Sequence, residues 1–157
     1  MSVGFAVAPA RSGVDARGIV TLGCGHGCVD MAQGAVPALL PFMIHQRHYS
    51  YAAASALVLA MTITSSLIQP VFGHFADRRS LPLLLPGGVL VAGVGIALAG
   101  AVNTYALTFA AVALAGVGVG AYHPEAARYA NYVSGERRAT GMSLFSVGGN
   151  LGFALGP

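Results

Sequence analysis

The sequence has 157 residues, a length typical of one soluble domain, but only 13 of them (8 Lys+Arg and 5 Asp+Glu) carry a formal charge. An average soluble chain has roughly a quarter of its residues charged, so these side chains are too few to cover a soluble surface. Apolar residues make up 55% of the chain, and 45 consecutive residues between Arg79 and Glu125 are uncharged. Composition therefore excludes disordered, nucleic-acid-binding and disulfide-rich secreted proteins and predicts a chain surrounded by lipid.

Five apolar segments follow one another, separated by charged or turn-forming residues. Residues 1–17 carry their positive charges after a short apolar run, unlike a secretory signal, and we expect a polar cytosolic tail. A membrane-spanning helix needs about 20 apolar residues, whereas a barrel strand needs only about 9 to 11 alternating ones. The lengths predict an all-α membrane protein with about five transmembrane helices within residues 18–157. The predicted helices cover residues 18–44, 51–75, 83–102, 105–133 and 139 onward.

The arginines predict how these helices are oriented. Seven of the eight lie in the N-terminal tail or toward the connections after the second and fourth segments. Arg47 is the exception, since it lies between the first and second segments. Short cytosolic loops retain positive charge, so we predict a cytosolic N-terminus. The location that we expect is the bacterial plasma membrane. The last nineteen residues are uncharged and lack a polar flank, and we therefore expect this chain to be the N-terminal fragment of a larger protein.

The first segment holds the most informative polar residues. His26, Asp30 and Gln33 are spaced i, i+4, i+7 and form one stripe on a helix. An ionised Asp near mid-bilayer costs about 2.5 to 3.5 kcal/mol on insertion scales, so this stripe should face the bundle interior or a water-filled cavity. We interpret it as a proton-binding or substrate-contacting site. The alternative is a structural hydrogen bond from Asp30 to another helix.

Cys24 and Cys28 alternate with His26 and Asp30, and one interpretation of this pattern is a metal site or a haem attachment site. Haem attachment requires two residues between the cysteines and an adjacent His, a spacing that is absent here. Alternate positions on a helix point around its axis and do not converge on one ion. We predict neither a metal nor another cofactor at these four residues, and no disulfide between the two cysteines.

A second polar group lies in the fourth segment. It comprises His123, Pro124, Glu125 and Arg128, of which Glu125 and Arg128 at i, i+3 are positioned to pair. Pro124 removes one helix hydrogen bond, and we expect a bend in the preceding glycine-rich turn. This group is either a substrate-facing or gating site or a static ion pair at the helix end.

Glycines at intervals of four suggest close helix packing. Gly116 and Gly120 have this spacing, as do Gly148, Gly152 and Gly156, which precede Pro157. Small residues at that interval let helix backbones approach closely in lipid.

Several motifs resemble those of one transporter family. Gly73, Asp77 and Arg78, between the second and third spans, resemble the loop signature of the major facilitator superfamily. Residues 152–157 are similar to the fifth-helix signature of its drug and proton antiporters. His26 with Asp30, together with residues 122–128 and 143–152, resemble the fosmidomycin-resistance branch of its efflux proteins.

This resemblance implies a twelve-helix transporter with two six-helix halves, of which the chain forms most of the first. Such folds place the substrate site near mid-membrane and rock one half against the other. It further implies export of a small organic drug in exchange for protons, with Asp30 and His26 as candidates for the proton step and Asp77 and Arg78 as a cytosolic gate. The implied partners are protons, a small-molecule substrate, the lipid bilayer and the missing C-terminal half.

Two other functions are transport of a different metabolite and catalysis by a membrane-embedded enzyme. Uptake or export of a different metabolite would keep the same fold, because fold does not determine cargo. A membrane-embedded enzyme would need a nucleophile with a base or a converging metal set, and none is visible, so we predict that the chain is not an enzyme.

Overall fold

The computed structural model describes residues 13–157, which fold into five helices with no strand among them. Each predicted segment corresponds to one helix, so the all-helical prediction is confirmed. The rest of the predicted tail, residues 1–12, lies outside the described part. The helices are α1 (Ala16–Arg47), α2 (Tyr51–Arg78), α3 (Leu84–Ala101), α4 (Tyr105–Val133) and α5 (Arg138–Leu155).

Capping residues explain why α1 is longer than predicted. The Asp15 carboxylate accepts a hydrogen bond from the Gly18 amide at 3.1 Å, so the helix begins at Ala16. At the other end, the polar residues expected to form a connection continue the helix to Arg47. The helix stops at His48, whose φ of 55° is left-handed.

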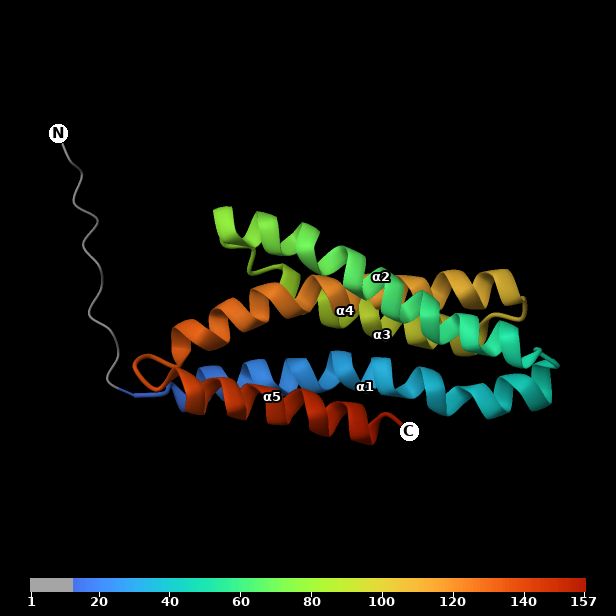
Figure 1. The fold of residues 1–157 in the computed structure, drawn as a ribbon, viewed down its shortest axis with the longest axis horizontal. Helices are drawn as coiled ribbons and strands as arrows, with labels where there is room; N and C mark the ends of the chain where they lie inside the picture. Colours follow the sequence, from blue (N-terminus) through green and yellow to red (C-terminus); the bar gives the residue numbers. More distant parts are fainter. Residues whose placement is uncertain (1–12) are drawn as a thin grey trace.

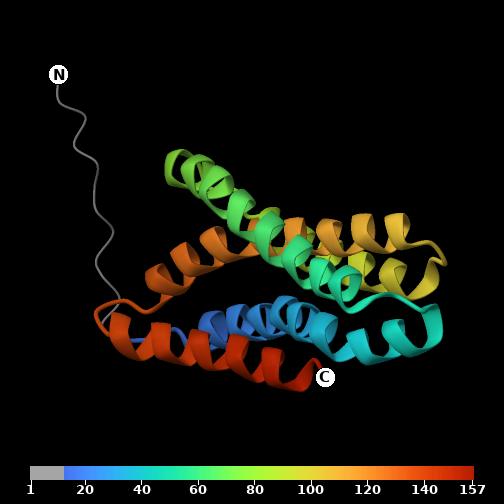
Figure 2. The ribbon, with the colours of Figure 1, turned by 45° about the vertical axis from the view of Figure 1, so that its right-hand side comes forward.

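The helices form two groups. α1 and α5 lie side by side along one side of the bundle, while α2 and α3 each pack on α4 on the other (Figures 1 and 2). α4 contacts all four other helices and connects the two groups. It is bent along its length (Figure 1), as expected of a helix with Pro124 in its interior. The joint between α1 and α4 therefore lies at the centre of the bundle.

Large apolar side chains cover the outside of the bundle. Leu59, Leu67, Leu90 and Leu151 are each more than half exposed, an arrangement suited to contact with lipid. Four helices, α1 to α4, are long and apolar enough to cross a membrane. The described chain is an integral membrane protein.

Glycines allow the helices to approach closely. A Cβ added at Gly118 would meet the backbone of Ala92 on α3, and one at Gly120 would lie 2.7 Å from the Ser65 carbonyl oxygen on α2. A Cβ added at Gly152 would meet the Gly27 backbone on α1. The small residues are thus required by the packing of α4 and α5.

Replacing Gly152 by Val should destabilise the contact between α1 and α5. The added side chain meets backbone, which does not yield as a flexible side chain would, and overpacking of this kind costs about 1 to 3 kcal/mol. Gly93→Val is the matched control, because Gly93 is an exposed helical glycine with nothing within 4 Å of an added Cβ. Thermal unfolding in lipid nanodiscs should show a lower midpoint for Gly152→Val alone. Equal midpoints would contradict the packing.

Candidate functional site

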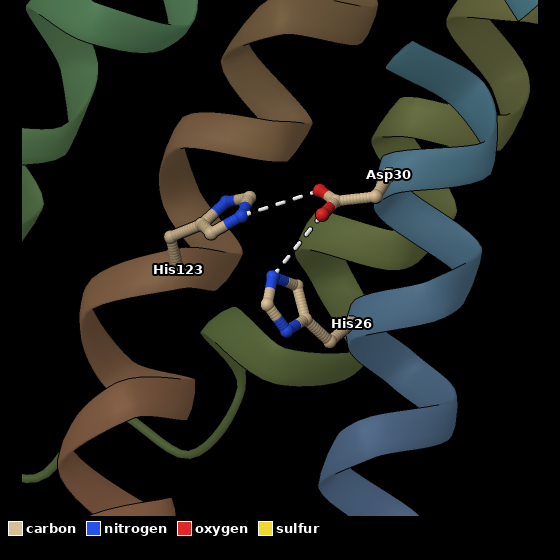
Figure 3. A group of neighbouring side chains, drawn as sticks. All are labelled: His26, Asp30 and His123. Atoms are coloured by element: carbon tan, nitrogen blue, oxygen red, sulfur yellow. Dashed lines mark ion pairs between the residues drawn. The ribbon is translucent and has the colours of Figure 1, made fainter. Parts of the chain in front are cut away.

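Three ionisable side chains meet at the joint between α1 and α4. Asp30 lies near the middle of α1, one helical turn after His26, and His123 reaches it from α4 (Figure 3). The Asp30 Oδ2 atom is 3.2 Å from His26 Nε2, and its Oδ1 atom is 3.3 Å from His123 Nε2. We call His26, Asp30 and His123 the polar triad. Its carboxylate is shared between two imidazoles from different helices.

The other ring nitrogen of each histidine faces a backbone carbonyl. His26 Nδ1 lies 3.0 Å from the Phe145 carbonyl oxygen on α5, and His123 Nδ1 lies 2.7 Å from the Val119 carbonyl oxygen on its own helix. The His26 ring also stacks on the Phe145 ring, with centroids 4.2 Å apart. Both imidazoles are therefore fixed at two points.

Two neighbours that sequence reasoning did not single out help to shape the triad. A Cβ at Gly149 on α5 would lie 2.5 Å from His26 Nε2 and 2.6 Å from Asp30 Oδ2, so glycine leaves the space that the ion pair occupies. The Tyr122 hydroxyl donates to the Leu22 carbonyl oxygen at 2.6 Å and anchors α4 against α1. Both residues lie within the stretches that resemble efflux proteins, which was the available signal.

A cavity of about 500 Å³ adjoins the triad on the side of His123. Its size falls in the range of small-molecule sites. The His123 side chain is 24% exposed, against 11% for His26, so His123 is the triad member most open to this cavity. Residues from α2, α4 and α5 line it, namely Ser66, Gln69, Pro70, His123, Pro124, Ala127 and Phe145.

The remaining polar residues of α1 lie apart from this group. Gln33 is half-buried and is not part of the triad. Cys24 and Cys28 are free thiols on the exposed side of α1, where they line an apolar depression against α5.

The second predicted cluster is divided in the structure, because His123 belongs to the triad while Glu125 and Arg128 form a separate pair. The two side chains form two hydrogen bonds, of 2.7 and 3.0 Å, although the Glu125 side chain is fully buried. Glu125 Oε1 also accepts from the Leu81 amide at 2.8 Å, and Arg128 donates to the Ser80 hydroxyl. This pair attaches the connection between α2 and α3 to the last turns of α4.

The expected gate loop requires a correction. Gly73, Asp77 and Arg78 lie in the last two turns of α2 and not in a loop, because the helix continues through the buried Ala76. Within residues 13–157, Asp77 and Arg78 are exposed and form no ion pair. The contacts between the α2–α3 connection and α4 are made by Ser80 and Leu81 instead.

The glycine motif of α5 runs along α1. Added Cβ atoms at Gly148, Gly152 and Gly156 would each meet α1 backbone, at Gly23, Gly27 and Met31 respectively. Pro157 follows the end of α5 and is exposed.

The donor atoms of the triad lie within 4.8 Å of one another, so a proton or a cation could occupy the space between them. Cys24 and Cys28, which alternate with His26 and Asp30 along α1, are not part of this group, and the third side chain is His123 from α4.

Comparison with known proteins identifies the fold. Residues 22–157 match the Major Facilitator Superfamily. The chain belongs to this superfamily. It is 32% identical over 148 residues to the fosmidomycin resistance protein of Escherichia coli strain K12, a match covering 94% of this chain and 36% of that protein. It is 28% identical over 139 residues to the uncharacterized MFS-type transporter YfnC of Bacillus subtilis strain 168, covering 88% and 34%.

The chain thus spans about a third of the length of these curated relatives. The Major Facilitator Superfamily consists of transporters, so the resemblance noted in the sequence and the prediction that the chain is not an enzyme are both confirmed.

Proposed function

We propose that the chain forms part of a proton-coupled exporter of small organic compounds, with the polar triad as its proton-binding site. The observation that supports this most directly is the position of the triad, half-buried between α1 and α4 beside a cavity of about 500 Å³. Ionisable groups inside membrane proteins are costly and are characteristic of proton or substrate pathways.

The residues of the triad suit reversible proton transfer. Imidazole titrates near neutrality, and a carboxylate between two imidazoles can pass a proton to either one. The cavity gives His123 a route to water and to a bound compound, while His26 lies deeper against Phe145. A compound entering the cavity would meet the triad directly, which is the contact that coupling requires.

The cargo we propose is a fosmidomycin-like antibiotic. The support is the 32% identity to a protein named for fosmidomycin resistance. Gln69 and Ser66 supply uncharged polar groups on the cavity wall, while Phe145 and Pro70 supply apolar ones. A small polar compound with an apolar portion fits that combination.

We further infer that the chain works with a second helical half, because it spans only about a third of its relatives' length. The complete transporter, meaning the chain together with that half, would enclose the cavity between the two. We propose that it lies in the plasma membrane, and the arginine distribution supports a cytosolic N-terminus. The 157 residues alone should insert into a membrane without transporting.

Everted membrane vesicles containing the complete transporter test this function. After the lumen has been acidified, fosmidomycin should raise the internal pH, because the drug enters as protons leave. A pH-sensitive dye in the lumen reports the change, and vesicles lacking the protein provide the baseline. A fall in internal pH would indicate cotransport in the same direction, and no change would remove fosmidomycin export from the proposal.

A further inference from the structure

Each imidazole of the polar triad lies between two oxygen atoms. His26 faces the Phe145 carbonyl and Asp30 Oδ2, while His123 faces the Val119 carbonyl and Asp30 Oδ1. A carbonyl oxygen only accepts hydrogen bonds, so each Nδ1 must carry a hydrogen. A neutral imidazole has only one N–H, and with it at Nδ1 the Nε2 lone pair would point at a carboxylate oxygen.

From this geometry we propose that the triad, as folded, holds two protons more than two neutral histidines and an ionised Asp30 would hold, and that the one shared by His123 and Asp30 is exchanged through the cavity. This inference rests on the proposed proton-coupled function and specifies its proton-binding site.

The count of two does not depend on which atoms carry the protons. Each of the two contacts between Nε2 and a carboxylate oxygen needs one hydrogen, supplied either by an imidazolium or by the carboxylic acid. A carboxylic acid carries a single proton and serves only one contact. Relative to two neutral histidines and an ionised Asp30, both arrangements contain two added protons, and the triad then has a net charge of +1.

Within residues 13–157, no other charged side chain joins the triad. α3 contains no ionisable residue, and the ionisable residues of α2 and α5 lie near the helix ends. Of the groups on α4, Glu125 is committed to Arg128, and the Tyr122 hydroxyl donates to the Leu22 carbonyl. The two thiols of α1 are on its exposed side. The hydrogens between the imidazoles and Asp30 must therefore be carried by atoms of the triad itself.

The two contacts with Asp30 differ in the helices that they join and in their access to the cavity. His26 and Asp30 belong to one helix, and the His26 ring is stacked on Phe145. The contact between His123 and Asp30 joins two helices, and His123 lines the cavity. After loss of a proton, water in the cavity can replace Asp30 as the partner of His123, whereas His26 has no such access. The interhelical contact should therefore open first and loosen α1 from α4 beside the cavity.

Nitrogen-15 NMR of histidine tests this count, because imidazolium, Nδ1–H and Nε2–H rings give distinct signals. The complete transporter is labelled with ¹⁵N-histidine and ¹³C-aspartate in lipid bilayers, and His26→Gln and His123→Gln assign the signals by difference. We expect two added protons at about pH 5 and, as the pH rises through the range of histidine titration, a change at the contact between His123 and Asp30 before any change at the contact between His26 and Asp30.

If one variant fails to fold, proximity to the labelled Asp30 carboxylate still identifies the triad histidines, and the other variant tells them apart. A single added proton at low pH, loss from His26 before His123, or a metal ion that elemental analysis finds in the wild type and not in His123→Gln would each overturn the proposal. Absence of fosmidomycin-driven proton movement in vesicles would instead remove fosmidomycin export from the proposed function. If the count is one proton while fosmidomycin still drives proton movement, the proposed function stands and only the two-proton inference is rejected.

Discussion

Asp30→Asn in the complete transporter should reduce fosmidomycin-driven proton movement to the level of vesicles without the protein. The amide can accept from one imidazole through its oxygen and donate to the other through its nitrogen, so both contacts of the triad survive. One of the two hydrogens then belongs to the amide, which does not ionise, so it can no longer be released as a proton. The variant should keep its fold and its thermal unfolding midpoint while losing proton coupling.

Cys28→Ser is the matched control, since residue 28 lies on the same helix but on its exposed side. It should leave both transport and stability at the wild-type level. Unchanged proton movement in Asp30→Asn vesicles would remove Asp30 from the mechanism. A large fall in the unfolding midpoint would indicate that Asp30 serves mainly to hold α1 against α4, which was the structural alternative raised by the sequence.

The helices were predictable because bilayer thickness imposes a minimum length on apolar segments. That constraint gave the order of all five helices, and residues 105–133 match α4 at both ends. The errors lie where local hydrogen bonds extend a helix past the first polar residue. Asp15 caps α1 earlier than predicted, and α2 continues through Asp77 to Arg78, which changes a presumed gate loop into helix.

The triad was only partly predictable. The spacing of His26 and Asp30 placed them on one face of a helix, because helical periodicity is a local property. The contact with His123 joins residues 93 positions apart and depends on how α1 and α4 are rotated against each other. Neither periodicity nor composition specifies that rotation. Gly149, which makes room for the ion pair, lies in a stretch that resembles efflux proteins, but neither that resemblance nor the general preference for small residues at helix contacts specifies its role.

Arg128→Ala should be among the most destabilising single substitutions on α4. Glu125 is fully buried, and Arg128 supplies the only positive charge paired with it within residues 13–157. Removing one partner of a buried ion pair leaves an uncompensated charge and costs about 3 to 5 kcal/mol. Because the Arg128 side chain is 40% exposed, we expect a value near the lower end, about 3 kcal/mol, measured as a fall in the unfolding midpoint in nanodiscs.

Glu125→Gln separates the effect of charge from that of shape. Its amide oxygen can still accept from the Leu81 amide, and Arg128 can turn toward water, so the loss should be about 1 kcal/mol, as for a single hydrogen bond. Combining Glu125→Gln with Arg128→Ala should restore part of the stability lost in Arg128→Ala, because the buried charge is then absent. If the double variant were less stable than Arg128→Ala, burial of an unpaired carboxylate would not be the cause.

Exchange of the two charges, Glu125→Arg with Arg128→Glu, should not restore stability, although spacing at i, i+3 alone would suggest that it does. Position 125 is enclosed and faces the Leu81 amide, a donor that needs an acceptor. An arginine there supplies only donors, so the Leu81 amide loses its partner and a larger cation must fit a site without solvent. Full recovery by the exchanged pair would show that the contact to the α2–α3 connection contributes nothing, and that Glu125 and Arg128 act only on each other.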